Sequence, residues 1–269
     1  MADRKTDAEL IEHNRFAWNR LSDEGILWGI PVADDAVERA RNGAWEVQLA
    51  GRSPVPHHWF GKDGQIRDRD ILCLAAGGGQ QAPLLSAAGA RVTAMELSDA
   101  MLAKDREVAR RHDLPLRCEQ GSMTDLSRFA NDSFDVIFLP VAICYVPDAH
   151  QVWQQCARVL RPGGRLLAGM INPLVNLFAE NDGTTDAGLE VVHALPFVEL
   201  ETLSSAEREA AFKRRIAFVW SHTLTDLVGG QLSAGFRLLE FSEARRTDDR
   251  APNINKFTNT YIMTAARLG

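Results

Sequence analysis

The stretch that decides the fold reads DILCLAAGGGQQA and covers Asp70–Ala82. An apolar run stops at three consecutive glycines, and helix-forming residues follow as far as Ala88. A short, continuous apolar run that ends at glycine is typical of a strand buried on both faces. The pattern therefore predicts a strand, a tight glycine turn and a helix.

The same rhythm repeats on the carboxyl side of this stretch. Apolar runs without alternation indicate parallel strands covered by helices on both faces, and right-handed crossovers then give a doubly wound α/β sheet. The further strands are expected at Arg91–Glu96, Leu116–Glu119, Phe134–Leu139 and Arg165–Met170, with helices starting at Ser98 or Asp99 and spanning Val152–Leu160.

Beyond Asn172-Pro173 the pattern changes. A short hairpin is expected from Leu189–Phe197 and Ile216–Trp220, and a helix from Thr223 to Ala234 that is interrupted at Gly229-Gly230. Two last strands, Phe236–Glu243 and Thr258–Ala266, are expected to pair antiparallel, which makes a mostly parallel sheet of seven strands. We interpret the chain as one domain with four parts: a helical cap (1–60), a cofactor-binding core (61–172), an insertion or lid (173–221), and the last helix with the antiparallel hairpin (222–269).

Composition excludes several classes of protein. The net charge of −6 gives no general attraction for nucleic acid phosphates. The four cysteines form no C-x-x-C pair and no zinc-ligand spacing, so we expect no metal and a reducing compartment. The amino-terminal residues are too polar for a signal peptide, and no apolar stretch is long enough to span a bilayer. The expected location is the cytoplasm, without membrane or nucleic acid partners.

The glycine turn and one acidic residue together indicate an adenosine-containing ligand. A glycine turn between strand and helix presents backbone N–H groups and lets a ligand approach the backbone. Glu96 ends the second strand, where a carboxylate accepts hydrogen bonds from the ribose hydroxyls of such ligands. These two features fit a nicotinamide cofactor as well, so the identity of the ligand is still open at this point.

Three later motifs separate the alternatives. They read GSMTDL at 121–126, SFDVIF at 133–138 and RVLRPGGRL at 158–166. In order and spacing they resemble the class I S-adenosylmethionine-dependent methyltransferases, and most closely the small-molecule group. The resemblance covers about residues 68–172, and the final antiparallel hairpin also suits that family. A nicotinamide-binding domain continues with parallel strands instead.

The resemblance implies S-adenosylmethionine as cofactor and a set of residues that hold it. The glycine turn surrounds the methionine moiety and the ribose, Glu96 holds the ribose hydroxyls, and Leu97 packs on the adenine. Ser122 and Met123 lie at the adenine, and Leu139 and Pro140 lie near the transferable methyl group. The full expected set is Ala75, Ala76, Gly77, Gly78, Gly79, Gln80, Gln81, Glu96, Leu97, Ser98, Met101, Gly121, Ser122, Met123, Leu139 and Pro140.

The sequence departs from the family pattern at two anchors of the cofactor. The acid of the first motif is Cys73 here, and the aspartate at the adenine edge is Ser122. Gln80 and Gln81 offer amide groups that could compensate for these two changes. These departures keep a non-catalytic S-adenosylmethionine-binding protein as an alternative, with a nicotinamide-dependent oxidoreductase as the third.

The sequence says less about which residues bind and activate the methyl acceptor. The cofactor carries the electrophile, so the protein mainly orients the acceptor and excludes water. His222 is the first candidate for a general base, because histidine titrates near neutral pH, and Tyr145 is a candidate to orient a hydroxyl. Trp28, His57, Trp59 and Cys144 are candidates for acceptor binding. Each also has a structural interpretation, as a helix cap, a core aromatic or a packed thiol.

The acceptor class is narrowed by exclusion. Methylases of exocyclic amino groups carry an [DN]-P-P-[YFW] run after the fourth strand, and this chain reads Leu139-Pro140-Val141-Ala142 there. Together with the acidic charge, this favours a small-molecule acceptor. The sequence does not distinguish an O, S or N atom, and it leaves the oligomeric state open.

Overall fold

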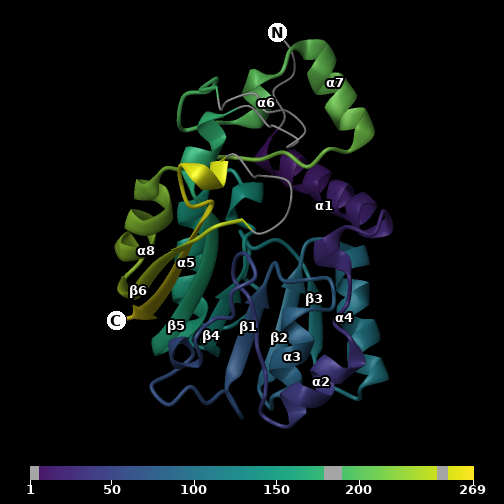
Figure 1. Cartoon of the computed structure of the whole chain (residues 1–269), viewed down its shortest axis with the longest axis vertical. Helices are drawn as coiled ribbons and strands as arrows, with labels where there is room; N and C mark the ends of the chain where they lie inside the picture. Colours follow the sequence, from purple (N-terminus) through teal and green to yellow (C-terminus); the bar gives the residue numbers. More distant parts are fainter. Residues whose placement is uncertain (1–5, 179–189, 247–253) are drawn as a thin grey trace.

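Seven strands form one twisted sheet with helices on both faces (Figure 1). The computed structural model describes residues 6–178, 190–246 and 254–269. The strand order is β3-β2-β1-β4-β5-β7-β6, and only β7 runs antiparallel to its two neighbours. This confirms the predicted doubly wound sheet with its antiparallel end. The strands are β1 Asp70–Leu74, β2 Arg91–Glu96, β3 Arg117–Gln120, β4 Phe134–Leu139, β5 Leu160–Ile171, β6 Phe236–Ala244 and β7 Tyr261–Leu268.

The central strands bury both of their faces. In β1, Leu72 and Leu74 belong to one apolar cluster, whereas Ile71 and Cys73 belong to the cluster on the opposite face. All four side chains are fully buried. Successive side chains of a strand point to opposite faces, so a strand covered on both sides needs the continuous apolar run that the sequence shows.

The helices divide between the two faces. Leu85 of α3 and Leu102 of α4 pack in one cluster, together with Ala40 of α2. Trp153 of α5 packs in the other cluster with Leu227 of η5. The bounds are α2 Asp34–Arg41, α3 Gln81–Ala87, α4 Asp99–Arg111, α5 Ala149–Val159, η5 Thr225–Gly229 and α8 Gly230–Ser233.

We call the edge of the sheet where the parallel strands have their carboxyl ends the carboxyl edge. A third, smaller apolar cluster lies beyond this edge. It joins Leu10 of α1 (Asp7–Asp23) to Ala211 of α7 (Ser205–Arg214) and to Phe218 and Trp220. In Figure 1, α1, α7 and the short α6 (Glu199–Thr202) lie above the sheet. The start of the chain and the insertion after β5 therefore cover the carboxyl edge together.

One buried side chain ties these two segments. Asn14 of α1 is fully buried, and its Nδ2 donates hydrogen bonds to the backbone oxygens of Tyr145 (3.2 Å) and Phe218 (3.1 Å). Its Oδ1 accepts the N–H of Phe218 at 2.8 Å. A buried amide with three satisfied bonds fixes the relative position of the segments it joins.

The insertion differs from its prediction. The expected hairpin is reduced to isolated bridges, Val198 with Trp220 and Phe178 with Val191; Leu189 lies outside the described residues. Two helices, α6 and α7, occupy the space between. The sequence did carry a signal for α7, because Ser204 and Glu207 form a capping box.

The predicted helix Thr223–Ala234 forms as a π-helical turn, η5, followed by α8. Gly230 is required there, since a Cβ would lie 2.7 Å from the indole Cδ1 of Trp153. Short 3₁₀ turns complete the fold at η1 Leu27–Gly29, η2 His57–Trp59, η3 Ile143–Tyr145, η4 Pro173–Leu177 and η6 Ile254–Lys256. Within the described residues, no helix combines the length and the apolar character that crossing a membrane requires.

Candidate cofactor and acceptor site

The glycine loop lies at the carboxyl end of β1 and is covered by the segment that follows α1. Gln80 Nε2 donates to the backbone oxygens of Leu27 and Ile30, and Val32 N–H donates to the oxygen of Gly79 at 2.9 Å. Gly78 has a φ of 109°, and a Cβ on it would lie 2.2 Å from the carbonyl oxygen of Trp28. Only glycine fits both the backbone conformation and this contact.

Two carboxylates hold the N–H groups of this loop. Glu96, at the end of β2, accepts Gly77 N–H through Oε2 at 3.1 Å and Ser98 N–H through Oε1 at 2.9 Å. Asp105, on α4, accepts Gly78 N–H through Oδ2 at 3.1 Å and Gly79 N–H through Oδ1 at 3.2 Å. The three glycine N–H groups, which the sequence predicted to face a ligand, therefore bind protein carboxylates in this structure.

Burial controls the ionisation of both acids. Glu96 is 9% exposed and Asp105 is fully buried. Burial raises the pKa of Glu96, against the opposing effect of its backbone hydrogen bonds. Burial raises the pKa of Asp105 well above its usual range, and the nearby charge of Glu96 adds to this effect. The glycine loop therefore contacts two buried carboxyl groups, and its N–H groups only partly offset the unfavourable burial of their negative charge.

The other expected cofactor residues lie along the same edge. Ser98 caps α4 by accepting Met101 N–H, and Leu97 precedes it. Gly121 follows β3 and donates its N–H to the backbone oxygen of Glu96 at 3.0 Å. The remaining expected positions follow the ends of their strands in the same way: Ser122, whose hydroxyl pairs with Thr124 at 2.8 Å, the buried Met123, Leu139 at the end of β4, and Pro140 after it.

These residues fit an adenosine ligand. The open ends of β1, β2, β3 and β4 stand side by side at one edge, which is where such ligands bind in doubly wound sheets. At Gly77 a Cβ would lie 2.5 Å from Cγ of Glu96, so the absence of a side chain lets this carboxylate lie against the loop.

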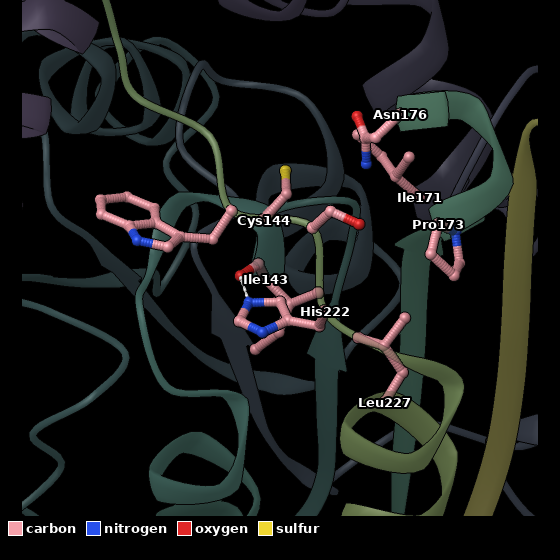
Figure 2. Close-up of a pocket in the computed structure, with 9 residues that line it drawn as sticks. Ile143, Cys144, Ile171, Pro173, Asn176, His222 and Leu227 are labelled. Atoms are coloured by element: carbon pink, nitrogen blue, oxygen red, sulfur yellow. Dashed lines mark hydrogen bonds between the residues drawn. The ribbon is translucent and has the colours of Figure 1, made fainter. Parts of the chain in front are cut away.

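A cavity of about 10 Å³ lies at the carboxyl ends of β4 and β5 (Figure 2). Its walls come from the turn after β4, the turn after β5, and the segment that precedes η5. All of the lining side chains are uncharged or, for histidine, neutral in the buried state described below. They are Ile143, Cys144, Ile171, Pro173, Asn176, Trp220, Ser221, His222 and Leu227.

The structure places His222 in the wall of this cavity, together with Cys144. The Nε2 of His222 lies 3.0 Å from the backbone oxygen of Ile143 and 3.1 Å from that of Val146. Two acceptors at one nitrogen assign the proton to Nε2, which leaves the lone pair on Nδ1. Burial lowers the pKa of His222, so its imidazole is neutral at pH 7. The helix start that follows is capped by Thr223 and Asp226 and not by His222.

Cys144 and Tyr145 are not activated. Burial raises the pKa of the Cys144 thiol to about 12, so it is a packed thiol in the wall. Burial also raises the pKa of Tyr145, whose ring meets Trp18 edge-on at 5.0 Å. Tyr145 does not line the cavity that contains His222. The structure therefore separates the two candidates for catalysis.

Three expected acceptor-binding residues lie elsewhere. Trp28 covers the glycine loop through its backbone. His57 stacks on Trp45 at 3.9 Å and lines a separate hollow of about 430 Å³. Trp59 is 5% exposed, and its carbonyl accepts a hydrogen bond from Arg165, which pairs with Val136 near the start of β4. His57 and Trp59 thus stand apart from the cavity at the carboxyl edge, and we leave them out of the proposed acceptor site.

Three residues that shape the site were not singled out from the sequence. Asp105 holds the glycine loop, Asn14 fixes the cap, and Ser221 lines the cavity. Asp105 carried a usable signal, because it lies on the apolar side of an amphipathic helix, between Leu102 and Val108. A lone acid among buried positions marks a carboxylate with buried partners.

Comparison with known proteins identifies relatives of the chain. A family model described as a methyltransferase domain matches residues 72–168. A Bacillus subtilis protein named uncharacterized methyltransferase YbaJ is 36% identical over 255 residues, which is 95% of this chain and 97% of that protein.

Solved structures share the fold. An S-adenosylmethionine-dependent methyltransferase from Mesorhizobium loti superposes with a TM-score of 0.60 at 19% identity, over 76% of this chain and 92% of that one. The 1,6-didemethyltoxoflavin-N1-methyltransferase of Burkholderia thailandensis, solved with its substrate and S-adenosylhomocysteine, gives 0.58 at 16% identity, over 100% and 92%. The motifs, the sheet order and the full-length relative agree, and the chain belongs to the class I S-adenosylmethionine-dependent methyltransferases.

Proposed function

We propose that this protein transfers the methyl group of S-adenosylmethionine to an O, S or N atom of a small-molecule acceptor. One observation carries the proposal: Glu96 at the end of β2 and the cavity beside His222 at the ends of β4 and β5 lie at the same carboxyl edge of the sheet. Membership of the family identifies the cofactor, and we place the acceptor beside it at the same edge of the sheet.

We propose a role for each of the expected cofactor-binding residues. Glu96 accepts the ribose hydroxyls, Leu97 packs on the adenine, and Ser122 and Met123 lie at its edge and face. Leu139 and Pro140 line the reacting side. The cofactor supplies an electrophilic methyl group on a sulfonium, so the protein contributes orientation and exclusion of water.

On the acceptor side, we assign His222 as the base. Its Nε2–H is committed to two backbone carbonyls, and Nδ1 retains the lone pair that accepts a proton from a hydroxyl acceptor. The lowered pKa keeps the ring neutral, which is the state a base requires. Tyr145, the candidate to orient an acceptor hydroxyl, does not line the cavity beside His222, and we leave it out of the proposed acceptor site.

The partners follow from the same properties. The free thiols of Cys73, Cys118, Cys144 and Cys156 support a reducing compartment such as the cytoplasm. The negative net charge supports a small acceptor over nucleic acid.

Calorimetric titration with S-adenosylmethionine, S-adenosylhomocysteine and NAD tests the cofactor. We expect micromolar binding of the first two and at least tenfold weaker binding in Glu96→Ala, which corresponds to about 1.4 kcal/mol or more. Glu240→Ala, at an exposed position of β6, is the matched control and should bind normally. Methyl transfer is then screened on phenols, thiols and amines. Tight binding of NAD alone would overturn the proposal, and binding without transfer to any acceptor would favour the non-catalytic alternative.

A further inference from the structure

Ser221 carries a buried hydroxyl with nothing to bind. The residue is 5% exposed, and its Oγ has no hydrogen-bond partner among the described residues. The backbone around it is fixed, because Ser221 N–H donates to Phe197 O at 2.7 Å and Trp220 N–H donates to Cys144 O at 2.8 Å. A buried polar atom without a partner destabilises the fold, and this hydroxyl differs from the other unpartnered ones in lining a cavity, where a group from outside can bind it.

The surroundings of Ser221 define what that partner can be. Ser221 lines the cavity at the ends of β4 and β5, whose volume of about 10 Å³ holds about one water-sized group. Asn176, from the turn after β5, lines the same cavity and brings a second polar side chain (Figure 2). The rest of the wall is mostly apolar. The space therefore receives a single polar atom attached to an apolar body.

The lack of charged residues in the lining narrows the chemical class of the partner further. None of the nine lining residues is Asp, Glu, Lys or Arg. The nearest acid in sequence is Asp226, whose carboxylate already binds Thr223 and His150. An ionised group in this cavity would lose its water without gaining a counter-charge, which costs far more than burying a neutral polar group.

We propose that this cavity binds an uncharged hydroxyl or carbonyl group of the methyl acceptor, with Ser221 as its hydrogen-bond partner. The inference rests on the proposed function and adds the acceptor class: neutral small molecules, and not carboxylates, phosphates or ammonium compounds. Ser221 is then a specificity-determining residue. His222 lines the same cavity and lies beside the acceptor group that Ser221 binds.

Three probes with the same ring test this class. Benzyl alcohol, benzoate and benzylammonium differ in the charge of the head group, and their binding is measured by ligand-observed NMR on the full chain with S-adenosylhomocysteine present. We expect benzyl alcohol to bind at least tenfold more tightly than either ion. Ser221→Ala should weaken benzyl alcohol three- to tenfold and leave the Tm unchanged or higher, because the variant removes an unsatisfied atom.

Ser86→Ala is the matched control. Its hydroxyl is also buried and without a partner, but it lies in α3, outside the cavity. This variant should bind benzyl alcohol as the unmodified protein does. Equal binding of the ions, equal effects of the two serine variants, or no binding of any probe would each overturn the inference. A lowered Tm in Ser221→Ala with unchanged probe binding would show that the cavity holds a structural water only.

The two proposals fail separately. Loss of the proposed function appears as no binding of S-adenosylmethionine in calorimetry. Loss of the acceptor class appears in the probe series while cofactor binding and methyl transfer to a charged acceptor remain.

Discussion

The carboxylate of Asp105 accepts the backbone N–H of Gly78 at 3.1 Å, across 27 residues of chain. Its second oxygen accepts Gly79 N–H, so one side chain of α4 sets the conformation of the loop that ends β1. We predict that Asp105→Ala lowers the free energy of unfolding by about 1–3 kcal/mol and weakens S-adenosylmethionine binding roughly tenfold. Calorimetry and urea unfolding measure the two effects.

Asp105→Asn separates geometry from charge. The amide keeps one acceptor oxygen and the size of the side chain, so cofactor binding should fall less than in the alanine variant. Glu107→Ala, on the exposed side of the same helix, should change neither property. Normal cofactor affinity in Asp105→Ala would contradict the role of this residue in positioning the loop.

Ala75 adopts a left-handed conformation, with a φ of 50°. A Cβ is unfavourable there by about 1 kcal/mol. Glycine removes this strain but adds chain entropy in the unfolded state. We predict that Ala75→Gly leaves the free energy of unfolding unchanged or raises it by up to about 1 kcal/mol. The neighbouring Ala76 is not among the positive-φ residues, so Ala76→Gly should lower it by about 1 kcal/mol. Thermal unfolding of both variants gives the comparison, and equal losses would argue against strain at Ala75.

Asn14 couples the cap to the acceptor cavity. Asn14→Leu keeps the branched shape of the side chain but leaves the polar backbone of Phe218 without its partner. We predict a loss of about 2–4 kcal/mol in the free energy of unfolding, with a higher KM for the acceptor and little change in cofactor affinity. Asn42→Ala, at the exposed end of α2, is the control. A cofactor affinity that falls in step with acceptor binding would show that Asn14 supports the whole edge.

We predict that His222 makes the free energy of unfolding depend on pH. Its pKa is lowered in the folded protein, so the unfolded chain takes up a proton first when the pH falls below about 6.5. The contribution of His222 to stability is therefore complete above that pH and is lost as the pH falls through its folded pKa. Urea unfolding between pH 8 and pH 5 should show a smaller acid loss in His222→Gln than in the unmodified protein. His58→Gln, at an exposed position, should keep the full loss.

Much of the fold could be predicted from the sequence, because β1, β4 and the second half of β5 are apolar runs and a triple-glycine turn follows β1. Glu96 could be found by its place at the end of the second strand. The contacts of Asp105 with the glycine loop could not, since they join residues far apart in the chain through backbone groups that are identical at every position. Ser221 was missed for a related reason: an unpaired hydroxyl is defined by its surroundings and not by a motif.

The insertion was the least predictable part. Its two bridges are isolated, so it lacks the alternation that marks a longer strand pair. Its helices bury few residues, which weakens their periodicity. The aromatic residues near the start of the chain were predicted with two alternatives, core packing and acceptor binding. Trp59 is a core side chain, and its pairing with histidines in sequence suggested a site that the topology places beside the start of β4.

The position of β7 between β5 and β6 has a consequence for how the protein is made. Among the strands of this sheet β7 comes last in sequence, and it pairs with β5 through seven residues and with β6 through eight. A nascent chain on the ribosome therefore holds β5 with an unpaired edge until the residues of β7 have been made, and until then β6 has no neighbour to join. An unpaired strand edge is prone to aggregate. Premature termination shortly before Tyr261 would release a chain whose Rossmann core is nearly complete but whose sheet is open, and we expect such a product to be cleared by proteases or lost to inclusion bodies.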